Sequence, residues 1–137
     1  MTDLALYITW KNYSSWSLRA WLLMRALEIP FEEILVPMTD EARLPAMAGI
    51  SLTRKVPCLI DRGMSGGMSA VTIWETLAIA EYLDELFPER GVWPEDMASR
   101  ATARAMVAEM HAGFAALRSE CPMNLRRPSA PMAVSDS

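Results

Sequence analysis

The stretch LALYITWKNYSSWSLRAWLLMRALEIP, residues 4–30, decides the fold. Its first part, Leu4 to Thr9, is almost continuously apolar, which is typical of a strand buried on both faces of a sheet. A polar turn follows, and from Trp16 to Glu28 the apolar side chains recur at helical spacing without glycine or proline. Pro30 ends that helix. A buried strand that leads into such a helix predicts a strand–helix–strand crossover in an α/β fold.

The remaining sequence continues this alternation. Further strands are expected at 31–36, 56–61 and 71–74, and further helices at 40–48, 75–87 and 97–118. The helix between the first two strands indicates a parallel pair, and the close spacing of the last two strands indicates a hairpin. Through residue 87 the order is β-α-β-α-β-β-α, which is the thioredoxin-like layout. The glycine-rich segment 63–69 is expected to be a flexible connection, because it lacks the G-K-[ST] ending of a phosphate-binding loop.

The chain is expected to contain four regions of different organisation. Residues 1–87 form the thioredoxin-like domain, 88–95 a linker rich in turn residues, and 96–126 the first helix of an all-α domain. Residues 127–137, RPSAPMAVSDS, are rich in proline, serine and small side chains, so a disordered tail is expected there.

The composition restricts the class of protein. Of 137 residues, 52% are apolar and 22% are charged, which excludes wholesale disorder. The net charge of −4 argues against nucleic acid as the main partner. The most apolar run, Ala20 to Leu27, is interrupted by Arg25 and is too short to cross a bilayer, and no signal peptide is visible. A cytoplasmic protein without a membrane partner is therefore expected.

Few residues could serve as metal ligands or redox groups. Cys58 and Cys121 are too far apart for a C-x-x-C pair or a zinc motif, so Cys58 is interpreted as a small buried apolar residue. His111 is the only histidine, which excludes two-histidine mechanisms. It either lines a substrate pocket or is a structural or solvated side chain. No metal and no resident cofactor are expected.

The turn 12–15 is the first candidate site. It joins the buried strand to a helix, and a helix N-terminus offers free N–H groups and a positive dipole end to an anion, including a thiolate. Ser14 could also donate its hydroxyl hydrogen to that sulfur. The alternative is that Ser14 or Ser15 serves only as a helix cap.

Lys55-Val56-Pro57 is the second candidate. A cis Val56–Pro57 bond would direct the N–H and C=O of Val56 outward, where they could pair with an extended peptide-like ligand. The alternative is an ordinary trans proline at the edge of the sheet.

Glu75 and Thr76 form the third candidate, where a strand ends and a helix begins. Thr76 could offer its hydroxyl and N–H to a carboxylate, and Glu75 could accept from an ammonium group. The alternative is an ordinary helix start. Taken together, the three candidates offer a short peptide an anchor at each end and a backbone partner in the middle.

These segments resemble the N-terminal glutathione-binding domain of the cytosolic glutathione transferases. The matching pieces are LYITWKNYSSWSLRAWLL, RKVPCLID, VTIWETLAIAEYLDELFP and the linker GVWPED. The stretch ARAMVAEMHAGFAALRSECPMNLR resembles the next helix of bacterial members. The resemblance spans residues 4–126.

The resemblance implies a catalytic residue at the first helix. Serine-type members, including the zeta and tau classes, carry a serine five residues before an arginine, as Ser14 and Arg19 do here. Ser14 then resembles the residue that stabilises the glutathione thiolate, with Ser15 as the neighbouring backup. Tyr7 lies near the position of the hydroxyl in tyrosine-type members and ranks after the serine. Trp16 stands where the zeta pattern has a cysteine, which argues against zeta-type isomerase chemistry.

The resemblance also implies how the rest of glutathione is held. Val56, before the family's cis-proline Pro57, looks like the backbone partner of the cysteinyl unit. Lys55 resembles a contact to the glycyl carboxylate. Glu75 and Thr76 match the family's Glu-Ser pair, which holds the γ-glutamyl end.

The implied function is that of a glutathione transferase with a role in detoxification. It would bind glutathione as co-substrate, stabilise the thiolate and transfer it to a small electrophile, and it would form a homodimer as family members usually do. The match stops near Arg126, so a relative truncated in the C-terminal helical domain is expected. The alternative is a non-catalytic glutathione- or partner-binding module.

Overall fold

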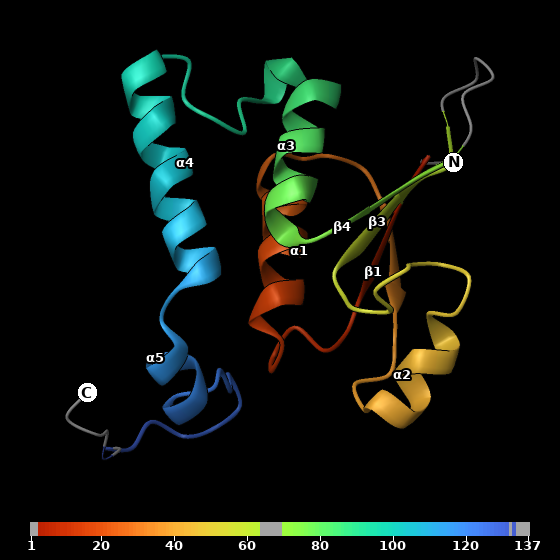
Figure 1. Ribbon diagram of the computed structural model, residues 1–137, viewed down its shortest axis with the longest axis vertical. Coiled ribbons are helices and arrows are strands. Elements are labelled where there is room, and N and C mark those ends of the chain that lie inside the picture. The colour runs from red at the N-terminus through yellow and green to blue at the C-terminus, as the bar shows by residue number, and fades with distance from the viewer. Residues whose placement is uncertain (1–2, 64–69, 132, 134–137) are drawn as a thin grey trace.

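Four strands form a single sheet in the order β2–β1–β3–β4 in the computed structural model, which describes residues 3–63, 70–131 and 133 (Figure 1). The strands are β1 Leu4–Ile8, β2 Glu32–Leu35, β3 Cys58–Asp61 and β4 Val71–Trp74. The pair β1–β2 is parallel, and the pairs β1–β3 and β3–β4 are antiparallel. Both the predicted crossover and the predicted antiparallel pairing of the last two strands are confirmed.

The helices follow the predicted order. They are α1 Ser15–Ala26, α2 Asp40–Ala46, α3 Thr76–Leu86, α4 Met97–Ala112 and α5 Ala115–Glu120, with a 3₁₀ turn, η1, at Pro88–Arg90. Figure 1 shows α1 and α3 lying against the sheet and α4 beside them, on the side away from the strands. This is the thioredoxin-like α/β arrangement followed by helices.

The side chains of β1 alternate between two apolar clusters. Leu4, Leu6 and Ile8 are buried against residues of α1 and α3, including Met24 and Ile79. Tyr7 points the other way and packs in a second cluster, whose buried members are Val36, Met47 and Cys58. A strand covered on both faces has no reason to alternate apolar with polar residues, which explains the run LALYI.

Helix α4 is held against the first part of the chain by charged side chains. Arg104 makes two hydrogen bonds to the carboxylate of Glu81 on α3, with N–O distances of 2.9 and 2.7 Å. Its guanidinium also lies over the ring of Trp93, which is buried. At the start of α4 the carboxylate of Asp96 accepts from the N–H of Ser99 at 2.8 Å and caps the helix.

The prediction of one continuous helix over 97–118 is wrong. The helix breaks at Gly113, and Phe114 adopts a left-handed conformation with φ of 62°. Apolar spacing continues across the break, so periodicity could not reveal it. Arg118 folds back, and its guanidinium donates to the carbonyl of Gly113 at 3.0 Å and to that of Met110. A side chain therefore satisfies carbonyls that a continuing helix would have bonded.

Two expectations fall largely outside the described residues. Of the expected flexible segment 63–69, only Gly63 is described. Of the expected disordered tail 127–137, residues 128–131 have no regular secondary structure, and 132 and 134–137 lie outside the description.

Candidate functional site

The N-terminus of α1 is organised by three polar groups. The hydroxyl oxygen of Ser14 accepts from the N–H of Ser17 at 3.2 Å, so Ser14 is the N-cap. The Ser14 hydroxyl donates in turn to Ser17 Oγ at 3.1 Å, and that buried oxygen also accepts from the N–H of Thr9 at 3.1 Å. Ser17 thus fixes both the end of β1 and the cap. Because Ser14 caps only the third N–H of the helix, the earlier ones stay available to a ligand.

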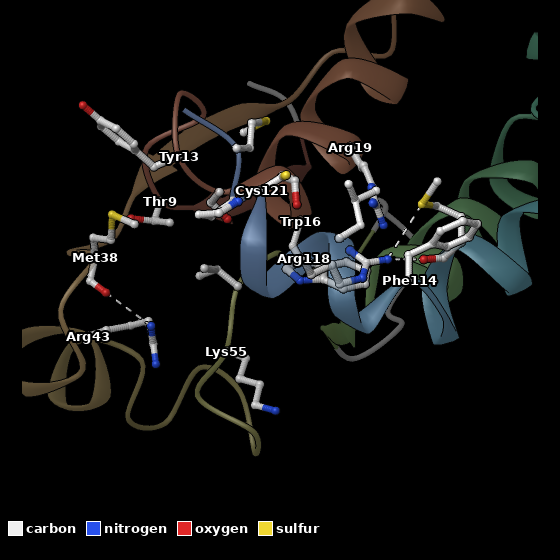
Figure 2. Close-up of a pocket in the computed structure, with 17 residues that line it drawn as sticks. Thr9, Tyr13, Trp16, Arg19, Met38, Arg43, Lys55, Phe114, Arg118 and Cys121 are labelled. Atoms are coloured by element: carbon white, nitrogen blue, oxygen red, sulfur yellow. Dashed lines mark hydrogen bonds between the residues drawn. The ribbon is translucent and has the colours of Figure 1, made fainter. Parts of the chain in front are cut away.

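A cavity of about 640 Å³ opens at this helix end (Figure 2). Ser14, Ser15 and Trp16 line it from α1, and Lys55 and Val56 line it from the loop before β3. The far wall is apolar and comes from the α4–α5 region, through Met110, Phe114, Leu117, Pro122 and Met123. The helix end identified in the sequence analysis therefore faces a solvent-open cavity with room for a small apolar group.

A second cavity, of about 230 Å³, adjoins the first. Lys55, Val56 and Trp16 line both spaces. Its other walls are formed by Thr53, Pro57, Trp74, Glu75, Thr76 and His111. All three candidate sites of the sequence thus border two adjoining cavities, although they lie some sixty positions apart at the extremes.

The Val56–Pro57 peptide bond is cis, so the alternative of a trans edge proline is wrong. No hydrogen bond within the described part of the chain uses the N–H or C=O of Val56. These two groups lie at a residue that lines both cavities. They are free to pair with an extended peptide backbone.

Glu75 and Thr76 stand at an uncapped helix start. Glu75 has φ of 72° and ψ of 129°, a conformation that costs a non-glycine residue about 1–3 kcal/mol and that clusters at functional sites. Its side chain does not cap α3. Thr76 Oγ1 is buried and has no hydrogen-bond partner in the described regions. The free N–H groups of this helix start favour a carboxylate.

Trp16 lines both cavities, and two arginine side chains lie over its ring. The guanidinium carbons of Arg19 and Arg118 lie 4.5 and 4.7 Å from its ring centroid. The His111 ring meets it edge-on at a centroid distance of 5.1 Å. Figure 2 shows Arg19 and Arg118 approaching Trp16 from α1 and α5, with Lys55 on a separate segment below them.

Tyr7 and Cys58 are not part of this site. Both belong to the apolar cluster on the other face of the sheet, and neither lines a cavity with Ser14. Burial raises the pKa of the Cys58 thiol, although a hydrogen bond with Ser51 opposes the shift. That confirms the interpretation of Cys58 as a buried apolar residue. Tyr7 is separated from the other candidates.

Some residues that shape the site were not predicted from the sequence. Ser17 is buried, lines neither cavity and fixes Ser14 through two hydrogen bonds; its one sequence signal was its place three positions after a candidate N-cap. Arg118 reaches Trp16 only because the chain turns back at Gly113, which no pattern indicated. The segment after α5 docks on the turn before α1, where the Leu125 N–H bonds the Asn12 carbonyl at 3.0 Å. This contact places Cys121 and its neighbours in the wall of the larger cavity.

The described residues contain no group of three or more His, Cys, Asp or Glu side chains that could hold a metal ion. None of their helices is both long and apolar enough to cross a membrane.

Comparison with known proteins finds a matching family model and related proteins. Residues 13–86 match the model of the glutathione S-transferase N-terminal domain. Two curated relatives are a probable maleylacetoacetate isomerase of Caenorhabditis elegans and a probable maleylacetoacetate isomerase 2 of Drosophila melanogaster. The first is 32% identical over 101 residues, covering 74% of this chain and 43% of that protein. The second is 28% identical over 116 residues, covering 82% and 47%. The chain thus spans less than half the length of these relatives.

Solved structures agree in fold. A glutathione transferase homolog from Burkholderia, solved with bound glutathione, superposes with a TM-score of 0.69 at 29% identity. The match covers 87% of this chain and 62% of that one. A glutathione transferase Omega 2C from Trametes versicolor has a TM-score of 0.68 at 19% identity, covers 84% and 52%, and supports the fold alone.

Proposed function

Because the chain belongs to the glutathione S-transferase family through its N-terminal domain, we propose that it binds glutathione and transfers the sulfur to a small electrophile. One observation carries this proposal: Ser14, Val56 and Glu75–Thr76, three candidates from distant parts of the chain, border two adjoining cavities. The bound glutathione named for the Burkholderia homolog supports the same ligand.

In this proposal glutathione lies extended across both cavities. Its γ-glutamyl carboxylate meets the start of α3 at Thr76, and its ammonium group meets Glu75. The backbone of its cysteinyl unit pairs with the free N–H and C=O of Val56, beside Pro57. Lys55 binds the glycyl carboxylate. The sulfur then points into the larger cavity, toward Ser14.

The N-terminus of α1 offers hydrogen-bond donors that would stabilise a thiolate. The cap bond from the Ser17 N–H fixes the position of Ser14 Oγ, and the hydroxyl hydrogen is free to rotate from Ser17 Oγ to the ligand sulfur. Ser15 is the backup donor, and Tyr7 ranks last because it lies on the other face of the sheet. A thiol with an ordinary pKa near 8.5 falls to roughly 3.5–7.5 in such surroundings.

The transfer step then follows ordinary nucleophilic chemistry. The thiol proton leaves to solvent, and the thiolate lone pair forms a carbon–sulfur bond to the electrophilic carbon. For an aryl halide, the halide leaves with the electron pair of the broken bond. Glutathione is consumed as co-substrate, and no other cofactor takes part. The apolar wall from α4 and α5 receives the body of the electrophile.

Different segments of the chain are expected to bind glutathione and the electrophile. We expect residues 1–87 to form the glutathione-binding unit, residues 88–95 to serve as a linker, and residues 96–126 to contribute the electrophile side. A homodimer is proposed as in the family, and light scattering of the purified chain tests it.

Calorimetry and a turnover assay together test the proposal. We expect glutathione to bind with micromolar to millimolar affinity, and Glu75→Gln to weaken binding about tenfold, because a charge-assisted bond to the ammonium is lost. Glu85→Gln, an exposed change on α3, is the matched control. Absence of glutathione binding would refute the proposal. Binding without turnover of either an aryl halide or an organic peroxide would favour the alternative, a non-catalytic binding module.

A further inference from the structure

Two contacts hold α5 and the segment after it against the N-terminus of α1. The Arg118 guanidinium lies 4.7 Å from the centroid of the Trp16 ring. Seven positions further on, the Leu125 N–H bonds the Asn12 carbonyl at 3.0 Å. The two segments therefore pass each other in opposite directions, and the residues midway along each lie opposite one another.

A cysteine lies midway along one segment and the candidate thiolate-stabilising serine midway along the other. They are Cys121, between Arg118 and Leu125, and Ser14. Both line the larger cavity, of about 640 Å³, in which the glutathione sulfur is proposed to lie. Cys121 is a free thiol and is partly exposed. Figure 2 shows it among the side chains that line this cavity. The fold thus places a thiol in the space proposed for the sulfur of the ligand.

The same cavity has a buried hydroxyl without a partner. Thr9 lines the cavity, is 4% exposed, and its Oγ1 makes no hydrogen bond in the part of the chain that the structure describes. The N–H of Thr9 is held by Ser17 Oγ at 3.1 Å, which fixes the residue in this position. A buried polar group left without a hydrogen bond costs about 1–3 kcal/mol. Independently of Cys121, the cavity therefore favours a ligand with polar groups of its own.

The other cysteine has none of these features. Cys58 is fully buried in the apolar cluster on the opposite face of the sheet and lines neither cavity of the site. Burial raises the pKa of its thiol, although a hydrogen bond with Ser51 opposes the shift. Disulfide exchange requires an accessible thiol that can lose its proton. We therefore expect exchange at Cys121 and not at Cys58.

We propose that Cys121 forms a mixed disulfide with glutathione, by exchange with glutathione disulfide bound in the site. The inference rests on the proposed function, because it uses the same binding site and adds a covalent state of that site. One half of the disulfide takes the place proposed for glutathione, along Val56 and the start of α3. The sulfur of this half lies in the larger cavity, and the second half extends toward solvent.

The exchange step balances in atoms and electrons. Cys121 gives its proton to solvent, and its thiolate attacks the sulfur of the bound half. A bond forms between Cys121 Sγ and that sulfur, the sulfur–sulfur bond of the glutathione disulfide breaks, and the second half leaves as a thiolate. Cys121 is oxidised, and the departing glutathione is reduced. The adduct fills the glutathione site and closes it to other ligands until a free thiol reverses the exchange.

Mass spectrometry of the full chain measures this exchange. Glutathione disulfide is compared with hydroxyethyl disulfide, which undergoes the same chemistry but has no groups for the glutathione site. The rates at Cys121 in the urea-unfolded chain give the intrinsic reactivity of each reagent. Relative to that reference, we expect the native chain to favour glutathione disulfide at least about tenfold, with a rate that saturates with its concentration. Peptide mapping should find one glutathionyl group, on Cys121 and not on Cys58.

Variants separate exchange in the site from exchange at an exposed thiol. Glu75→Gln should slow the reaction of Cys121 with low concentrations of glutathione disulfide about tenfold, because it weakens binding by that factor. Glu85→Gln is the control and should react as the wild type does. Cys121→Ser should take up no glutathionyl group and should still bind S-methylglutathione in calorimetry. The modified wild-type chain should lose that binding and regain it after treatment with dithiothreitol.

Three outcomes would overturn the inference and leave the proposed function standing, provided that the chain binds S-methylglutathione. They are a native chain with no preference for glutathione disulfide, a glutathionyl group on Cys58, and an unchanged rate in Glu75→Gln. Failure of both glutathione and S-methylglutathione to bind would overturn the inference together with the proposed function.

Discussion

The imidazole Nε2 of His111 lies 3.6 Å from a carboxylate oxygen of Glu75. The two residues come from different helices, α4 and the start of α3, and both line the smaller cavity. The Trp16 ring also meets the histidine ring edge-on, at a centroid distance of 5.1 Å. The pair is an ion pair only when the imidazole is protonated, and Glu75 is the group proposed to bind the ammonium of glutathione. His111 and the ligand therefore compete for one carboxylate.

His111→Gln should raise ligand affinity, because it removes the imidazole that lies 3.6 Å from the Glu75 carboxylate and competes with the ligand ammonium for it. S-methylglutathione is the ligand of choice, because it has no thiol to titrate. By calorimetry we expect the variant to bind this ligand about two- to fivefold more tightly than the wild type. Weaker binding by the variant would show that His111 holds the ligand instead.

Glu33 gives the fold a defined response to acid. Partial burial by itself would raise the pKa of Glu33, but hydrogen bonds from Lys11 and Trp21 and the charges of Lys11 and Arg25 outweigh burial and hold that pKa below its usual value. The Trp21 Nε1–H donates to it at 2.7 Å. A carboxylate with a lowered folded-state pKa stabilises the protein above its unfolded-state pKa. That contribution is lost as the pH falls through the folded-state value.

Glu33→Gln should therefore lower the free energy of unfolding at about pH 7 by roughly 1 kcal/mol or less, because the pair is partly solvated. The difference from wild type should diminish as the pH falls through the folded-state pKa of Glu33, because the wild-type carboxyl then becomes protonated. Urea denaturation at neutral and at strongly acidic pH measures it. Glu85→Gln, on an exposed position of α3, is the control and should match wild type at both. A deficit that persists in acid would contradict the assignment.

Gly113→Ala tests the break between α4 and α5. A Cβ at this position would lie 2.9 Å from the carbonyl oxygen of Glu109, which already accepts the Gly113 N–H at 2.8 Å. Relief of that contact must move the α4 end to which Arg118 is bonded. We expect a loss of about 1–3 kcal/mol of stability by urea denaturation. Unchanged stability would mean that residue 113 is not packed closely against the carbonyl of Glu109.

Much of the fold could be predicted because local pattern and global packing agree. The bounds of β4, Val71–Trp74, match the prediction, and β1 was identified by an apolar run that only a doubly covered strand needs. The differences lie at element ends. Thr9 leaves the strand because its N–H is taken by Ser17 Oγ. Helix α1 ends at Ala26, two residues before the predicted Glu28, which adopts a φ of 53°.

The candidate site was predictable only in its glutathione half. Ser14 and Thr76 lie at predicted strand–helix junctions, and Val56 precedes a proline. Such features can be recognised from a few neighbouring residues. Arg118 joins the site through a break in a helix whose apolar spacing is unbroken, so its role depends on a tertiary contact. Docking of the chain after α5 onto Asn12 is likewise a long-range contact without a local signal.

The apparent pKa of the glutathione thiol in the complex tests the central claim most directly. It is measured from the ultraviolet absorbance of the thiolate against pH, at saturating glutathione. We expect a value at least one unit below the free thiol in the wild type, and a rise of about one unit, or 1.4 kcal/mol, in Ser14→Ala. Ser15→Ala should shift it less, and Tyr7→Phe not at all, since Tyr7 lines neither cavity. Because Ser14→Ala also removes a helix cap worth about 1 kcal/mol, its fold is checked by circular dichroism. A bound thiol that titrates as it does in free solution, or a titration unchanged in Ser14→Ala, would contradict the account.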